Sequence, residues 1–186
     1  MITSIAALLA CMLLTGCHRG TSNDDAPISS ADWDATMTRL PRCLAASSTF
    51  EESEALRAWR LRAPHGTLAL PNTFRESSAP RKGVRRWTAS DLSVVEIATA
   101  RAPSGGLASD NDSRLIIENE CALPLKGHFA QVMQFRFTDI RSGRIMFGAA
   151  ASTVVRTNEA VNVWITAPTA RGRVQLLSAL SFMVLE

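Results

Sequence analysis

The start of the chain changes abruptly from apolar to polar. Residues 2–14 are almost wholly apolar and carry no charged side chain, whereas residues 18–31 (HRGTSNDDAPISSA) are rich in Gly, Ser, Asn, Asp and Pro. The apolar run is too short to span a bilayer core, which takes about 20 residues, but it has the length of the apolar region of a secretory signal. The pattern therefore predicts an export signal over 1–16, a flexible tether over 17–31 and one folded domain over 32–186.

One or two short helices are expected at the start of this domain. Over residues 30–40, apolar side chains recur at i, i+4 and i+7 from Trp33, after a capping Ser30. Residues 49–59 begin with TFEE, which has the form of a capping box, and predict a second helix.

The remaining pattern is typical of strands. Over 160–166, Val161, Val163 and Ile165 alternate with Asn, Trp and Thr, and over 128–137 four apolar side chains share one face. Such alternation predicts antiparallel strands joined by short turns. The expected strands are 66–71, 93–100, 114–119, 128–137, 144–155 and 160–166, and the expected turns and loops are 102–112, 139–143 and 156–159.

A helix is predicted to close the chain. After a capping Thr169, Val174, Leu177, Leu180 and Val184 recur at helical spacing. A helix with one apolar stripe covers one face of a sheet. The predicted fold class is therefore α+β, with a curved antiparallel meander covered by the C-terminal helix.

Composition and charge bear on only one class of function, the binding of nucleic acids. The chain has 46% hydrophobic residues and a formal net charge of +3. Its basic residues are almost all Arg, with only Lys82 and Lys126 as lysines, and it has no Tyr. We interpret this Arg excess as the codon bias of a GC-rich genome, so no nucleic-acid partner is predicted.

The end of the apolar run carries the most specific motif. Leu14-Thr15-Gly16-Cys17 resembles the lipobox of bacterial lipoproteins, in which a leucine and two small residues precede a cysteine. The resemblance implies that a signal peptide is removed before Cys17 and that acyl chains on Cys17 anchor the protein in a membrane. The following residue is His18 rather than the Asp that favours inner-membrane retention in enterobacterial lipoproteins. The periplasmic face of the outer membrane is therefore favoured over the inner membrane.

Two further cysteines remain in the mature domain. An even pair in an exported protein indicates a disulfide between Cys43 and Cys121, with two free buried thiols as the alternative. Their spacing has no CxxC character, so no redox or zinc site is expected.

The order of elements also resembles the PsbP-like fold, to which bacterial lipoproteins of the DcrB type belong. The segments LRAPHGTLALPNTF (61–74) and RVQLLSALSFM (173–183) carry this resemblance, which extends over residues 60–186. It implies a protein that binds partners and does not catalyse a reaction. No functional residue follows from it.

Candidate chemistry is sparse. His18, His65 and His128 are far apart in the sequence, and no hydrolase, nucleotide-binding or metalloprotease motif occurs. We therefore expect no catalytic residue, metal or cofactor, and predict that the protein is not an enzyme.

The sharpest charge cluster lies beside Trp87. This cluster consists of Arg81, Lys82, Arg85 and Arg86. It is either a surface that binds an anionic lipid or an acidic envelope protein, or a solvated loop with no partner.

Two functions remain open. The first is a non-catalytic, membrane-anchored envelope lipoprotein that binds a protein or cell-wall partner. The alternative is a carrier of a small molecule or lipid in a cavity under the sheet. A carrier predicts an open pocket lined by Phe135, Phe137, Phe147 and Trp164, in place of a filled core.

Overall fold

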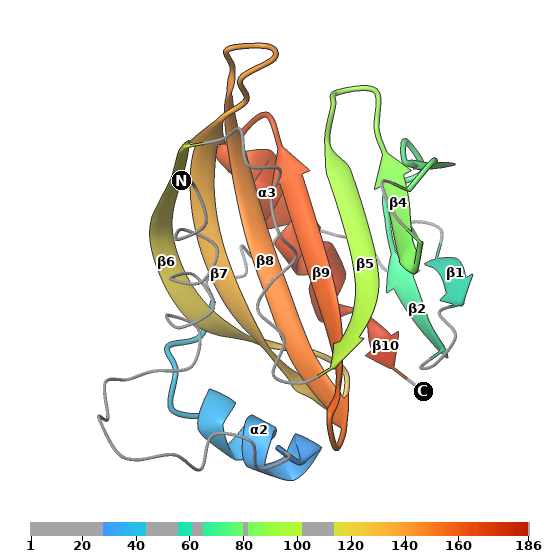
Figure 1. The fold of residues 1–186 in the computed structure, drawn as a ribbon, viewed down its shortest axis with the longest axis vertical. Helices are drawn as coiled ribbons and strands as arrows, with labels where there is room; N and C mark the ends of the chain where they lie inside the picture. Colours follow the sequence, from blue (N-terminus) through green and yellow to red (C-terminus); the bar gives the residue numbers. More distant parts are fainter. Residues whose placement is uncertain (1–27, 44–55, 61–64, 80–81, 102–113, 186) are drawn as a thin grey trace, which may run out of the picture.

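The computed structural model describes residues 28–43, 56–60, 65–79, 82–101 and 114–185. The largest element of the fold is one open sheet of seven antiparallel strands (Figure 1). Its strands, in spatial order, are β3 (Arg75–Ser77), β4 (Val84–Thr88), β5 (Val94–Arg101), β9 (Glu159–Ala167), β8 (Ile145–Arg156), β7 (Phe129–Thr138) and β6 (Arg114–Pro124). The predicted meander is confirmed for β6 to β9, which pair in chain order.

A second, smaller sheet has three strands. They are β1 (Leu56–Arg60), β2 (His65–Ala69) and β10 (Val184–Leu185), in the order β1-β2-β10. This corrects the helix predicted over 49–59, because residues 56–59 are extended and pair with β2. A capping box stabilises only the first turn of a helix. Hydrogen bonding along a whole strand outweighs that local preference. Residues 44–55 lie outside the described part of the chain.

The C-terminal helix α3 (Ala170–Ser181) covers one face of the large sheet, as predicted (Figure 1). Thr169 caps it, because its Oγ1 accepts a hydrogen bond from Gly172 N at 3.0 Å. The helix ends before Val184, which pairs in β10 and was expected to continue the helix. The main core fills the space between α3, β2 and the large sheet. The α+β fold class is therefore confirmed.

The N-terminal helix α2 (Ser30–Met37) packs on the other face of the large sheet. Its cap is Ser29, whose Oγ accepts from Asp32 N at 3.2 Å, one residue before the cap predicted from the sequence. Trp33 Nε1 donates to Phe129 O at 2.9 Å, and Asp34 Oδ1 accepts from Phe129 N at 2.9 Å. These two bonds hold α2 against the beginning of β7.

Three strands of the large sheet differ from the sequence pattern. Strands β3 and β4 were not predicted, because four charged residues interrupt their alternation of apolar and polar positions. Strand β6 was expected to end near residue 119 but continues to Pro124, after a bulge between Ile117 and Asn119. None of the described helices is long and apolar enough to cross a membrane.

Candidate interaction surface

Large aliphatic side chains are exposed at one end of the large sheet. Ile140 and Ile145 flank the turn between β7 and β8 and are 62% and 57% exposed. Leu92, in the turn between β4 and β5, is 55% exposed. The pairings of Thr138 with Ile145 and of Val94 with Thr166 place both turns at the same end of the sheet. We call this surface, formed by Leu92, Ile140, Arg141, Arg144 and Ile145, the hairpin end.

The β7–β8 turn is held in one conformation by Asp139. Its carboxylate accepts hydrogen bonds from Ser142 Oγ and from the backbone N–H groups of Arg141 and Ser142. These bonds, led by the one from the Ser142 hydroxyl, lower the pKa of Asp139, and the charge of Arg141 acts in the same direction. Gly143 supplies the positive φ of +66° at which the chain returns. The turn therefore presents its exposed side chains on a rigid frame.

The hairpin end also carries positive charge. Arg141 and Arg144 are exposed beside the two isoleucines, and neither forms an ion pair with any described carboxylate. Single exposed apolar residues are ordinary on a protein surface, but a group of them bordered by unpaired charge is typical of an interaction site.

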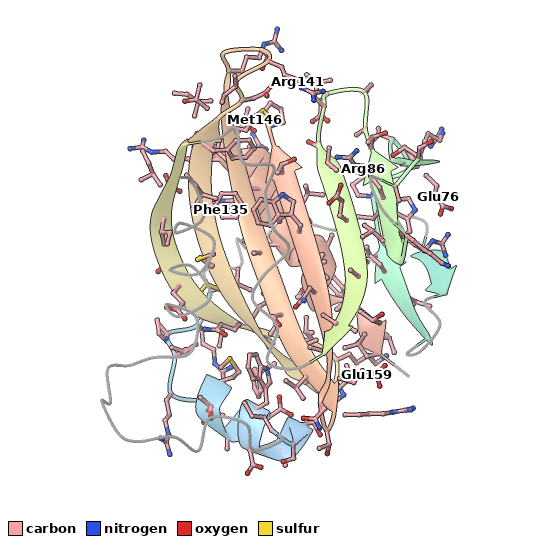
Figure 2. All side chains as sticks on the ribbon, in the orientation of Figure 1. Glu76, Arg86, Phe135, Arg141, Met146 and Glu159 are labelled. Carbon is pink, nitrogen blue, oxygen red and sulfur yellow. A yellow bond between two sulfur atoms is a disulfide. The ribbon has the colours of Figure 1, made fainter. Side chains whose placement is uncertain are left out.

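This surface lies far from the entry of the chain into the domain. Helix α2 contacts Phe129, at the beginning of β7, whereas the hairpin end follows Thr138 at the other end of that strand. A strand of this length spans about 30 Å. Figure 2 labels Arg141 and Met146 at one end of the sheet and Glu159 at the other.

The predicted basic cluster is not gathered on one surface. Arg85 Nη2 forms a salt bridge with Glu76 Oε1 at 2.6 Å, and its guanidinium lies 5.4 Å from the centre of the Trp87 ring. Arg86 lies on the other face of β4, where its Nε is 2.7 Å from Glu96 Oε1 (Figure 2).

Lys82 is exposed in the turn before β4, and Arg81 lies outside the described residues. Two of the four predicted charges are thus already paired with carboxylates. Binding of an anionic partner by this cluster stays a prediction.

The predicted disulfide is present. The sulfur atoms of Cys43 and Cys121 are 2.14 Å apart, and the α-carbons are 4.9 Å apart. The bond joins the segment after α2 to the edge of the sheet, where Cys43 N donates to Ala122 O at 3.0 Å and Ala122 N donates to Pro41 O at 2.8 Å. Cys121 lies within β6 rather than at its end. Cys17, the predicted lipidation site, is not among the described residues.

A buried charged contact between α3 and the sheet escaped the sequence analysis. Arg173 is only 8% exposed, and its Nη1 donates to Glu118 Oε2 at 2.6 Å and to Phe135 O at 3.1 Å. Glu118 is also 3.7 Å from Arg136 Nε. The only signal in the sequence is the place of Arg173 on the same helical stripe as Leu177 and Leu180.

The aromatic residues expected to line a pocket do not surround one space. Phe135 and Trp164 touch on the face opposite α3, with ring centres 4.5 Å apart, and Phe137 lies beside Phe135 (Figure 2). Phe147 lies on the other face, near the guanidinium of Arg173. The space between α3 and the sheet, lined by residues such as Leu123, Leu180 and Met183, has no room for a water molecule. That part of the core is filled.

The two histidines in the described part of the chain, His65 and His128, belong to different parts of the fold. His128 Nδ1 lies 3.8 Å from Asp34 Oδ2, beside the docked helix α2, and His65 begins β2. His18 lies outside the described residues. Among the residues that the structure describes, no group of three or more His, Cys, Asp or Glu side chains is placed to hold a metal ion.

Comparison with known protein families and with curated proteins finds no match. Among solved structures, the chain is similar to a protein from Bacteroides thetaiotaomicron VPI-5482, with a TM-score of 0.42 and 12% sequence identity over 65% of this chain. The chain spans 45% of that protein's length. A similarity this low carries no inference about function, and the resemblance to the PsbP-like fold stays a prediction.

Proposed function

We propose that the chain is a lipoprotein of the cell envelope that is anchored in a membrane through Cys17 and binds a protein partner without catalysing a reaction. The lipobox at Leu14-Thr15-Gly16-Cys17 supports the anchor. By the identity of His18, the anchor lies in the periplasmic face of the outer membrane.

The observation that carries the binding function is the hairpin end. Ile140, Ile145 and two arginines lie at the β7–β8 turn that Asp139 holds, and Leu92 is exposed in the β4–β5 turn at the same end of the sheet. An apolar centre with arginines at its edge suits a protein surface with an apolar patch and nearby carboxylates. The described chain begins just before α2, at the end of β7 opposite the hairpin end, so this surface is separate from the first described residues.

A photo-crosslinking experiment tests this assignment. A photoreactive residue in place of Ile140 is expected to form one discrete adduct in intact cells, and the same residue in place of Thr157 is expected to form none. Thr157 is a matched control, because it is exposed in the β8–β9 turn at the other end of the sheet.

A second substitution shows whether the adduct reflects specific binding. Ile145→Arg is expected to abolish the adduct of position 140, because it places a charge in the apolar centre. An adduct that forms equally from position 157, or that persists in Ile145→Arg, would contradict the proposal.

A further inference from the structure

The β4–β5 turn holds a leucine at a position where backbone geometry favours glycine. Ala89 N donates to Ser93 O at 2.9 Å and Leu92 N donates to Ala89 O at 3.1 Å, so these bonds enclose a loop of residues 90–92. Leu92, the last residue of this loop, has a φ of +72°. Three-residue hairpin loops commonly place their last residue in this left-handed region, and Gly is preferred there. A bulky L-residue in the same conformation strains the backbone, because its Cβ lies too close to a carbonyl oxygen.

The other described turns avoid this strain. The β7–β8 turn has Gly143 at a φ of +66°, and the β8–β9 turn has Asn158 at +62°. Every other described residue with a positive φ is also Gly. Gly has no Cβ, and the short polar side chain of Asn tolerates the left-handed region. Leu92 is therefore the exception among the turns that the structure describes.

The interior of the domain does not account for this leucine. Its side chain is 55% exposed, and it belongs to neither of the two core clusters. The side chain does not hold the loop either, because Asp91 accepts hydrogen bonds from Ser93 N at 2.9 Å and from Ser93 Oγ at 3.0 Å. Strained positions whose side chains lie outside the packed core cluster at functional sites.

We propose that Leu92 is the anchor residue of the hairpin end and that its side chain enters an apolar pocket of the protein partner. The inference rests on the proposed function, since it assigns a role to one residue of the same surface. Leu92 lies at the same end of the sheet as Ile140 and Ile145, whose turn has Gly143 at its left-handed position. Of these three aliphatic side chains, Leu92 alone is held at a cost to stability.

The neighbouring charges favour a protein pocket over a lipid surface. Leu92 directly follows Asp91, and Ile140 directly follows Asp139. Insertion of either aliphatic side chain into a bilayer would bring a carboxylate close to hydrocarbon or to anionic headgroups, and both oppose it. A protein pocket encloses the aliphatic side chain and leaves the carboxylate at its wet rim.

Substitutions at position 92 separate the role of the side chain from the strain. Leu92→Asn relieves the strain and removes the aliphatic group. It is expected to raise the melting temperature of the purified full chain by about 1–4 °C. In intact cells it is expected to reduce several-fold the protein adduct of a photoreactive residue at position 140. Leu92→Met keeps a long apolar side chain and is expected to retain this adduct.

The reciprocal control is Asn158→Leu, which places a leucine at the left-handed position of the turn at the other end of the sheet. This substitution is expected to lower the melting temperature by a similar amount, because it introduces the same strain. It is expected to leave the adduct of position 140 unchanged, because the β8–β9 turn is not part of the hairpin end.

The outcomes distinguish this inference from the proposed function on which it rests. An adduct that persists at full strength in Leu92→Asn, or a melting temperature that this substitution lowers, would overturn the role of Leu92 alone. If position 140 gives no adduct in the chain with Leu92 intact, or an adduct with lipid only, both the proposed function and this inference are overturned.

Discussion

Arg173 joins two elements whose own sequence patterns do not specify how they meet. Its guanidinium is buried under α3, bonded to Glu118 in the bulge of β6 and to the backbone of β7. A buried charge is tolerated only when it is paired and hydrogen-bonded, so both partners are needed at once. The bulge and the buried arginine therefore belong to one contact that sets the position of α3 on the sheet.

Removal of this arginine is expected to destabilise the domain. Arg173→Met keeps most of the side-chain length but loses both hydrogen bonds, and it should lower the free energy of unfolding by about 1–3 kcal/mol. The matched control is Arg171→Met, on the exposed side of the same helix, which should change it by less than about 0.5 kcal/mol. Urea unfolding of both variants measures the difference, and equal effects would contradict the role given to Arg173.

At the scale of elements, local patterns and long-range pairing disagree in the small sheet, over β1 and at Val184 in β10. The capping box at 49–52 predicts a helix, yet residues 56–60 form β1 and pair with β2 over their whole length. In contrast, the alternation over 128–137 and 160–166 agrees with the pairing, and both predicted strands are present. In β7 both faces are largely buried: Ala130 and Val132 belong to the main core, and Phe135 lies on the opposite face.

The disulfide links the N-terminal segment to the edge of the sheet and is expected to stabilise the domain. A cross-link across a sequence separation of 78 residues restricts the unfolded chain and contributes about 2–4 kcal/mol in the chain-entropy model. At roughly 2–4 °C per kcal/mol for a domain of this size, reduction should lower the melting temperature by several degrees.

Thermal unfolding with and without reductant measures this shift. In the variant with Cys43→Ser and Cys121→Ser together, reductant should have no effect, because the bond is absent. If the denatured, unreduced protein titrates with free thiols from both Cys43 and Cys121, the bond does not form in the cell.

At the scale of the whole molecule, helix α2 and the hairpin end lie at opposite ends of β7. Helix α2 holds the entry of the chain beside Phe129, and the tether of about 14 residues before it has a typical reach of roughly 20 Å. If Cys17 carries the proposed anchor, a tether of this length keeps the domain near the membrane.

Loss of the anchor is expected to release the protein. Cys17→Ser removes the thiol that receives the acyl chains, so the chain should leave the membrane fraction or accumulate as an uncleaved precursor. Cys43→Ser removes a cysteine but leaves the lipobox intact, and this variant should remain in the membrane fraction. Fractionation followed by immunoblotting separates the two results. A processed, membrane-bound Cys17→Ser protein would rule out the lipoprotein assignment.

The sequence by itself determined the features that depend on neighbouring residues. The meander of β6 to β9, the Thr169 cap of α3 and the turn after β7 all follow from spacing within one segment. The likeness of residues 14–17 to a lipobox is also a local feature. The exposure of Ile140 and Ile145 was not predicted. Alternation shows which residues share a face, but it does not show which part of a strand extends beyond the packed core.

Only the tertiary structure decided which distant residues meet. The sequence favoured the Cys43–Cys121 bond but left free thiols open, and the fold brought the two cysteines together. It also placed β5 beside β9 and paired Arg85 and Arg86 with Glu76 and Glu96. The physical reason is that the identity of a partner depends on the packing of the whole chain. Spacing along the chain reports only the faces of each element and not the surface against which each face is buried.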